Sequence, residues 1–261
     1  MHMRRLQGSA WLHGLAAISL LAGAAMAVAQ EPKGGTKMET KADSVAIRWW
    51  GQACWSLTAP DGKCVLVDPF PANFGYPSPT VEPQVCLVTH EHRDHNAVEN
   101  VKGSPKVIRG VGAHEAAGMK FVGVATFHDD AQGAKRGPNT VFAWQMAGIR
   151  FAHLGDLGHL LSPEQVKQIG AADVIMIPVG GYYTIDARQA VEVARQLSAK
   201  VVLPMHYKTA DVPRLPIAGI DDFLGAVPKE WQVEKPTAPL LSLSRGDLPK
   251  EGAKAIVLPY E

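Results

Sequence analysis

The sequence predicts a mixed α/β domain in which β-strands are layered with α-helices. Short apolar runs that are rich in Val, Ile and aromatic residues alternate along the chain with segments of helical periodicity. Two helix starts are marked by an N-cap residue with a Gln three positions later, at Ser162 and at Asp186. A chain of 261 residues is long enough for one large domain, so a multidomain architecture is not expected.

The first 29 residues have the features of an export signal. Arg4 and Arg5 form a basic start, residues 15–28 are apolar, and Ala27-Val28-Ala29 forms a cleavage site before Gln30. The apolar stretch is short and rich in Ala and Gly, so it fits a permanent transmembrane helix poorly, with an uncleaved anchor as the alternative. We expect export to the periplasm, with 232 residues (261 minus 29) after cleavage and no stable membrane insertion.

The part that follows is predicted to begin with an extended segment and a strand meander. Residues 30–44 carry charge, Gly and Pro without apolar periodicity, which indicates a flexible, solvated lead-in to a domain at residues 45–261. Pro60-Asp61-Gly62 marks a turn between the second and third of three early strands. These strands are predicted at residues 46–50, 54–58 and 64–67. Residues 70–83 form a proline-rich, aromatic loop that is too long for a plain connector.

Later elements follow the same pattern of strand and helix. A short apolar strand is predicted at residues 85–88, a helix-like stretch that carries a surface His114 at residues 113–119, and further strands around residues 121–127, 149–155 and 200–204. The helix that begins after Asp186 is expected to run to about Leu197.

Charge and cysteine content limit the classes of partner. Without Arg4 and Arg5 the chain has 24 basic and 25 acidic residues and no run of Lys or Arg, so we expect no nucleic-acid partner. Three cysteines allow at most one internal disulfide. The predicted turn places Cys64 opposite residue 57 or 58 instead of Cys54, so we expect Cys54, Cys64 and Cys86 to be buried thiols.

A dense set of metal-ligand side chains follows the predicted strand at residues 85–88. The segment His90-Glu91-His92-Arg93-Asp94-His95 offers four candidate ligands within six residues. On a turn after a strand, this spacing lets His90 and His92 converge on one ion while Asp94 and His95 reach a second. Imidazole and carboxylate ligands together suit zinc, manganese or iron.

Three further apolar runs each end in a candidate ligand, namely His128, Asp156 and His206. Strand ends at one edge of a sheet present functional groups to a common rim, so we expect these three residues to meet the first four. Five histidines and two aspartates suffice for two three-residue ligand sets with one bridging carboxylate. Each ion would keep an open position for water or substrate.

The order of these residues resembles the metallo-β-lactamase superfamily over about residues 45–261. The resemblance implies a four-layer αββα sandwich and two divalent metal ions, with zinc expected first and manganese or iron as alternatives. It assigns His90, His92 and His128 to the first ion, Asp94, His95 and His206 to the second, and Asp156 to a bridge. Five shorter stretches resemble the branch that contains ascorbate-6-phosphate lactonase and many metal-dependent hydrolases: Trp50-Gly51-Gln52, Asp68-Pro69-Phe70, residues 153–159, residues 178–181 and Pro204-Met205-His206.

Several polar residues near these positions have both a functional and a purely structural interpretation. His153 can support Asp156 or pack in the core, and His159 can contact substrate or lie in a solvated loop. Asp129 can orient a ligand histidine, bind substrate or stabilise a turn. In addition, Lys135, Arg136 and Asn139 can bind an anionic group or form an ordinary loop, and Tyr182 or Tyr183 can line a pocket or pack.

We therefore expect a metal-dependent hydrolase with His92 and Asp94 as its central catalytic residues. Two nearby cations lower the pKa of a bridging water, so that hydroxide is available near pH 7 to attack a small ester, lactone or phosphoester, with Asp94 orienting it. A β-lactam is an alternative substrate. The rival classes are a metal-sensing protein whose site is occluded by residues 70–83, and an iron oxidoreductase, which would require a redox partner domain. The oligomeric state is left open.

Overall fold

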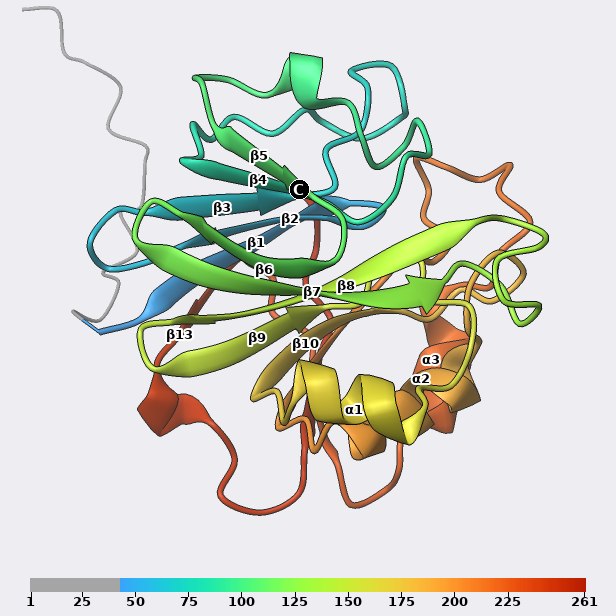
Figure 1. Ribbon diagram of the computed structural model, residues 1–261. Helices are drawn as coiled ribbons and strands as arrows, with labels where there is room; N and C mark the ends of the chain where they lie inside the picture. The colour runs from blue at the N-terminus through green and yellow to red at the C-terminus, as the bar shows by residue number, and fades with distance from the viewer. Residues whose placement is uncertain (1–42) are drawn as a thin grey trace, which may run out of the picture. The chain divides into compact units, whose positions relative to one another are not determined.

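A computed structural model describes residues 43–261, which form two facing β-sheets with α-helices against the second sheet (Figure 1). The predicted export signal at residues 1–29 and nearly all of the lead-in lie outside the described residues. The first strand begins at Val45, where the domain was predicted to start. Within residues 43–261, every helix is too short or too polar to cross a lipid bilayer.

The first sheet has six strands in the order β13-β1-β2-β3-β4-β5. Its members are β1 (Val45–Gly51), β2 (Cys54–Thr58), β3 (Cys64–Val67), β4 (Val85–Val88), β5 (Lys106–Arg109) and β13 (Leu240–Leu243). The predicted meander is confirmed, because β1, β2 and β3 pair antiparallel in sequence order, with Thr58 opposite Cys64. Strands β3, β4 and β5 then run parallel, so β3 and β4 end at the same edge of the sheet.

The second sheet has eight strands in the order β12-β14-β11-β10-β9-β8-β7-β6. Its members are β6 (Gly112–Ala116), β7 (Met119–Phe127), β8 (Pro138–Met146), β9 (Ile149–His153), β10 (Val174–Pro178), β11 (Val201–Met205), β12 (Gln232–Glu234) and β14 (Lys254–Ile256). Strands β9, β10 and β11 are parallel neighbours, so their carboxyl ends lie side by side. The antiparallel pair β7 and β8 continues the sheet beside β9.

Three helices lie against this second sheet, α1 (Pro163–Ile169), α2 (Ala187–Gln196) and α3 (Ile220–Ala226) (Figure 1). Both predicted helix starts are confirmed. Ser162 and Asp186 each accept a hydrogen bond from the backbone N–H of the Gln three residues later, and that Gln bonds back to the cap residue. These reciprocal bonds satisfy N–H groups that have no partner inside the first turn of a helix.

The outer face of the first sheet is covered differently from the expected αββα pattern. The sandwich itself is confirmed, but within the described residues this layer holds no α-helix: it contains the loop at residues 70–83 and a single 3-10 turn, η1 (Val98–Asn100), and Val212, Leu215 and Tyr260 pack in its apolar cluster. Phe70 and Tyr76 of the loop are 1% and 3% exposed and pack with Trp50 and Leu66 in a second apolar cluster. The aromatic side chains of this loop therefore replace a helix as the cover of the sheet.

The main core fills the space between the two sheets. Trp49, Trp55 and Val67 of the first sheet belong to the same buried cluster as Phe142 and Phe151 of the second. Complete burial of a side chain of this size is worth about 1.5–3 kcal/mol. The indole N–H of Trp55 also donates to the sulfur of Met205 at 3.2 Å, which ties the end of β11 to the first sheet.

One predicted element is wrong. Residues 113–119 are not helical, because β6 and β7 form a hairpin whose turn places Ala117 and Gly118 at φ values of 53° and 72°. Pairing with β7 overrides the helix-favouring composition of this stretch. His114 lies on the edge strand β6, partly exposed, and donates a hydrogen bond to the carbonyl of Gly110. The three cysteines are free and buried, as predicted.

Candidate metal centre

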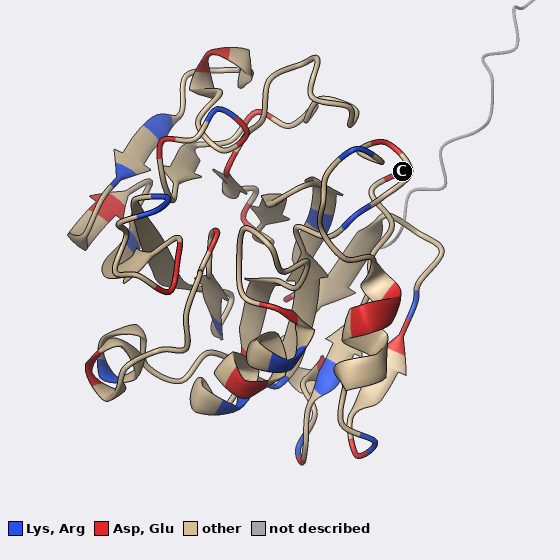
Figure 2. Ribbon diagram, turned by 90° about the vertical axis from the view of Figure 1, so that its right-hand side faces the viewer, with Lys and Arg blue, Asp and Glu red and all other residues tan. Residues whose placement is uncertain are grey.

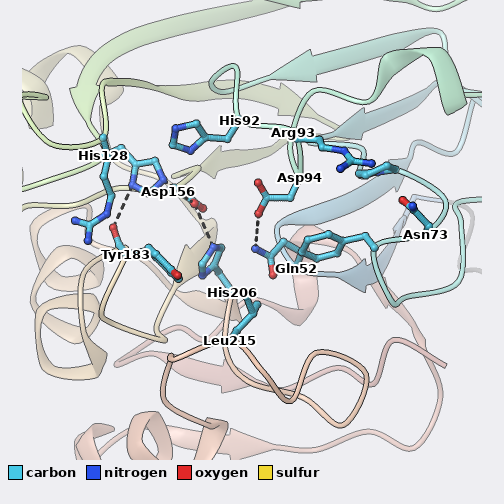
Figure 3. Close-up of a pocket in the computed structure, with 13 residues that line it drawn as sticks. Gln52, Asn73, His92, Arg93, Asp94, His128, Asp156, Tyr183, His206 and Leu215 are labelled. Atoms are coloured by element: carbon cyan, nitrogen blue, oxygen red, sulfur yellow. Dashed lines mark hydrogen bonds and ion pairs between the residues drawn. The ribbon is translucent and has the colours of Figure 1, made fainter.

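The seven predicted ligands come together where strands from both sheets end. The loop that follows β4 carries His90, His92, Asp94 and His95, while His128 follows β7, Asp156 lies just beyond β9 and His206 follows β11. Figure 3 shows His92, Asp94, His128, Asp156 and His206 directed toward one common space. Residues separated by more than 100 positions are thus neighbours, as the strand-end pattern predicted.

Two groups of these side chains are arranged so that each can hold one ion. The ligand atoms of His90, His92 and His128 lie within 4.8 Å of one another, and so do those of Asp94, His95 and His206. These groups are the two sets that the family resemblance assigned. Asp68 also falls within this distance of His90 and His95, but its carboxylate already accepts three hydrogen bonds.

Asp156 lies between the two groups. Its Oδ2 atom is 3.0 Å from Nε2 of His128 and 3.9 Å from Nε2 of His90 in one group. The same oxygen is 3.3 Å from Nε2 of His95 and 3.1 Å from Nε2 of His206 in the other. A single carboxylate that faces both groups has the position required of a bridging ligand.

Asp68 orients a ligand histidine of each group, a role that the sequence analysis did not assign. Its Oδ2 accepts hydrogen bonds from Nδ1 of His95 at 3.0 Å and from Oγ1 of Thr89 at 2.7 Å. Because the Thr89 hydroxyl donates to Asp68, its oxygen accepts from Nδ1 of His90 at 2.9 Å. Both histidines are thereby held in the tautomer whose Nε2 is free to bind a metal.

Two further contacts fix Asp94 and His128. The amide of Gln52 donates to Oδ2 of Asp94 at 2.8 Å, and Nδ1 of His128 donates to the backbone carbonyl of Tyr183 at 3.1 Å (Figure 3). Gln52 and Asp68 were noted in the sequence only as parts of family-like stretches. Asp68 directly follows the apolar run of β3, so the strand-end signal that singled out Asp156 also marks this residue.

Asn139 and Gly155 position the Asp156 carboxylate. The side-chain oxygen of Asn139 accepts from the backbone N–H of Asp156 at 3.0 Å, while its amide donates to the carbonyl of Leu154. Gly155 has a φ of 56°, and a Cβ added there would lie 2.2 Å from Oδ1 of Asn139. Only glycine allows the backbone to approach this closely. Asn139 is thus a buried positioning residue and not part of an anion-binding loop.

The electrostatics of the cluster favour the ligand states of His90 and Asp156, whereas the neighbouring carboxylates, above all Asp156, raise the pKa values of His95 and His206 despite their burial. Burial and the neighbouring His95 lower the pKa of His90 to about 3, so this imidazole is neutral near pH 7. Burial opposes ionisation of Asp156, but the charges of His206 and His95 and hydrogen bonds from His128 and His206 hold its pKa well below the usual range. Neutral imidazole and ionised carboxylate are the forms that bind divalent cations.

Several buried polar atoms in this cluster lack hydrogen-bond partners within the described part of the chain. They include Nε2 of His90, Nε2 of His95 and Oδ1 of Asp156. A buried polar atom without a partner costs about 1–3 kcal/mol, so such atoms need an explanation. The two imidazole nitrogens belong to different ligand groups, and cations at both positions would satisfy them. The residues present therefore fit a metal centre.

The cluster opens into a cavity of about 520 Å³. One part of its wall is apolar and is formed by Pro71 and Phe74 of the loop at residues 70–83, together with Leu215. Its polar lining consists of Gln52, Asn73, His92, Arg93, Asp94, His128, Arg136, Asp156, Tyr183 and His206. A volume of this size accommodates a small molecule.

The remaining candidates divide between structural and lining roles. His153 is fully buried and donates to the carbonyl of Ala53, and Nε2 of His159 accepts from the backbone N–H of Phe127. Asp129 accepts four backbone N–H bonds from residues 131–136, so it stabilises a turn. Tyr182 is 66% exposed and does not line the cavity, whereas Tyr183 does.

Comparison with known proteins supports the same family. The family model of the β-lactamase superfamily domain matches residues 46–206. A solved Thermotoga maritima protein, described as a candidate Zn-dependent hydrolase of the metallo-β-lactamase superfamily, is 38% identical with a TM-score of 0.67, over 82% of this chain and 98% of its own.

Two curated relatives are named UPF0173 metal-dependent hydrolase. The protein from Thermoplasma volcanium is 29% identical, over 64% of this chain and 86% of its own length. The protein from Methanoregula boonei is 31% identical, over 62% and 82%. The family match spans more than half of the chain and contains all seven clustered candidate ligands. The chain therefore belongs to the metallo-β-lactamase superfamily.

Proposed function

We propose that the protein is a metal-dependent hydrolase with a dinuclear centre that acts on a small ester or lactone. The observation that carries this proposal is the pair of separate ligand groups arranged about the single carboxylate of Asp156, open to a cavity of about 520 Å³. The names of the relatives, which include metal-dependent hydrolase and Zn-dependent hydrolase, agree with it.

Zinc is the metal we expect first, because mixed His and carboxylate ligands suit it, with manganese or iron as alternatives. When bound, two such ions supply an acidified water and polarise the electrophilic group of the substrate. His90, His92 and His128 would hold one ion and Asp94, His95 and His206 the other, with Asp156 shared.

The protein side chains then orient the attacking water and the substrate. Gln52 holds Oδ2 of Asp94, and the Asp94 side chain remains 28% exposed to the cavity. Its carboxylate can therefore accept a hydrogen bond from the water that attacks the substrate and orient it, while the amide of Gln52 holds Oδ2 in place. His92 is exposed at the cavity, where it can bind one ion and contact the substrate.

The substrate classes are ranked by the resemblance of five short stretches to the branch that contains ascorbate-6-phosphate lactonase. A lactone or small ester is the first substrate class, a phosphoester is the second, and a β-lactam is the third. A metal sensor without turnover would need a closed site, but Pro71, Asn73 and Phe74 of the loop at residues 70–83 line the cavity while His92 stays exposed. This openness supports turnover over sensing.

The test is turnover by the zinc-loaded protein of a panel that holds a lactone, a phosphodiester and a chromogenic cephalosporin. We expect lactone hydrolysis to be fastest, and we expect His92→Ala and Asp94→Ala to lose activity and metal together. His114→Gln, which changes a histidine on the edge strand β6, is the matched control and should behave as the unmodified protein. Full activity in either site variant contradicts the mechanism. If the cephalosporin is hydrolysed fastest, a β-lactam replaces the lactone as the substrate class. Two bound metal ions per chain without turnover of any substrate favour a metal sensor.

A further inference from the structure

Two arginine side chains line the cavity on different sides of the ligand cluster. Arg136 lies beside Tyr183, with its guanidinium carbon 5.5 Å from the centre of the tyrosine ring. Arg93 extends near Asn73, beyond Asp94 and away from Tyr183 (Figure 3). Neither forms a salt bridge with a carboxylate among residues 43–261, whereas Arg109, Arg150 and Arg195 each do.

Arg136 is held in place more firmly than a surface arginine. Its backbone N–H donates to Oδ2 of Asp129 at 2.7 Å, within the turn that Asp129 closes with four such bonds. Its side chain is partly buried and lies over the ring of Tyr183, at a distance where a guanidinium is attracted to an aromatic face. A partly buried guanidinium without a carboxylate partner among residues 43–261 is suited to bind an oxyanion through two parallel hydrogen bonds.

Tyr183 connects Arg136 to the ligand cluster. The backbone carbonyl of Tyr183 orients His128 by accepting its hydrogen bond, and the guanidinium of Arg136 lies over the ring of Tyr183. Arg136 additionally lines a second, adjoining cavity of about 280 Å³ that includes His90 and His92. A group bound by Arg136 would therefore lie directly beside the first ligand group.

The charges that line the cavity also favour an anionic ligand. Arg93 and Arg136 balance Asp94 and Asp156, so two divalent cations would leave the cavity with an excess of positive charge, even with the buried Asp68 behind the histidines. Elsewhere basic and acidic segments are interspersed along the chain in the view of Figure 2. Selection by charge is thus a local property of the cavity and not of the whole surface.

We infer that the preferred substrate carries an anionic substituent, a carboxylate or a phosphate, next to its scissile bond, and that Arg136 is the residue that recognises it. This inference rests on the proposed hydrolase function. Lys135 does not share the role, because its ammonium pairs with Asp130 at 2.7 Å, is 58% exposed and does not line the cavity. Arg93 is exposed to solvent, which screens its charge, so it contributes less than Arg136.

The experiment measures binding, so that it does not depend on turnover. Acetate, succinate and 3-phosphonopropionate are titrated calorimetrically into the zinc-loaded protein, whose metal content is determined in parallel. One carboxylate of each probe can occupy the metal centre, and only the latter two carry a second anionic group. We expect succinate or 3-phosphonopropionate to bind about tenfold more tightly than acetate, the order expected for a charge-assisted bidentate contact. The probe that loses more affinity in Arg136→Met identifies carboxylate or phosphate as the substituent that Arg136 recognises.

Three variants assign the effect to a side chain. Arg136→Met should reduce the preference for the dianionic probes to less than about twofold, and Arg136→Lys should restore part of it. Lys135→Met removes the neighbouring charge outside the cavity and should leave the preference as it is. Equal binding of all three probes to the unmodified protein overturns the inference, and so does retention of the preference in Arg136→Met or its loss in Lys135→Met.

The outcome is separate from that of the hydrolase test. If the substrate panel shows no turnover but the preference depends on Arg136, the anion site stands and the hydrolase proposal fails. If turnover is found without any preference for a second anionic group, the hydrolase proposal stands and the anion site fails.

Discussion

Replacing Asp68 by Asn should weaken metal binding although Asp68 belongs to neither assigned ligand group. The carboxylate accepts the backbone N–H of Thr89 on Oδ1, and it accepts the Thr89 hydroxyl and Nδ1 of His95 on Oδ2. An amide has one oxygen for these three donors. If the NH2 group faces His95, Nδ1 must become an acceptor and the proton moves to Nε2, the atom that faces the metal position.

The magnitude follows from the loss of this orientation. Changing a residue that orients a metal ligand costs about 10–100-fold in metal affinity, which corresponds to about 1.4–2.7 kcal/mol. The loss should be larger for the group of Asp94, His95 and His206, because His95 contacts Asp68 directly. The group of His90 is reached only through Thr89, so its ion should be weakened less.

The assay is zinc titration of metal-free protein in competition with a chelator of known affinity. Asp173→Asn is the matched control, because Asp173 is also a buried carboxylate but accepts its hydrogen bonds from Arg150, outside the cluster. Thermal unfolding shows that both variants are folded under the assay conditions. Two zinc affinities in Asp68→Asn within twofold of those of the unmodified protein would refute the reasoning.

Three other predictions concern stability and thiol chemistry. Gly155→Ala should lower the free energy of unfolding by about 2 kcal/mol or more in a urea titration, since its Cβ would collide with Asn139. Gly225→Ala has open space in α3 and should raise the free energy of unfolding by up to about 1 kcal/mol. Burial opposes ionisation of Asp173, but hydrogen bonds from Arg150 lower its pKa, so its stabilising effect is present above about pH 4 and is lost as the pH falls. In Asp173→Asn the free energy of unfolding should therefore fall less steeply with decreasing pH. An unchanged pH dependence would argue against this. Burial raises the pKa of Cys86 to about 12 and also raises the pKa values of Cys54 and Cys64. A thiol reagent at pH 8 should therefore label none of these three cysteines in the folded protein and all three after unfolding.

The parts of the site that are local in sequence could be predicted without a structure. The segment from His90 to His95 places four ligand-type residues on one turn, and His128, Asp156 and His206 each follow an apolar strand. Because parallel strands share their carboxyl edge, the strand-end pattern was sufficient to bring these residues together.

The contacts that orient these residues depend on the pairing of distant strands. Asn139 lies on β8, and its bond to Asp156 follows from the position of β8 beside β9. Gln52 reaches Asp94 across 42 positions of sequence. Neither residue lies in a periodic pattern that distinguishes it from an ordinary strand or loop residue.

In the fold as well, features set by neighbouring residues could be predicted, whereas features set by distant residues could not. Capping boxes marked the starts of α1 and α2, since their hydrogen bonds connect residues three positions apart. Residues 113–119 were predicted to be helical because His114 lies among helix-favouring residues, and only pairing with β7 makes this stretch a strand. The cover of the first sheet by Phe70 and Tyr76 likewise depends on tertiary packing.

The central claim is that two ligand groups share the carboxylate of Asp156 and hold two ions. The most direct measurement is the number of zinc ions per chain, determined by elemental analysis of the purified protein after loading with zinc and removal of the excess, beside His128→Ala and His206→Ala. The account predicts about two ions in the unmodified protein and about one in each variant, with a different group depleted in each. One ion or none in the unmodified protein, or two ions in both variants, would contradict it.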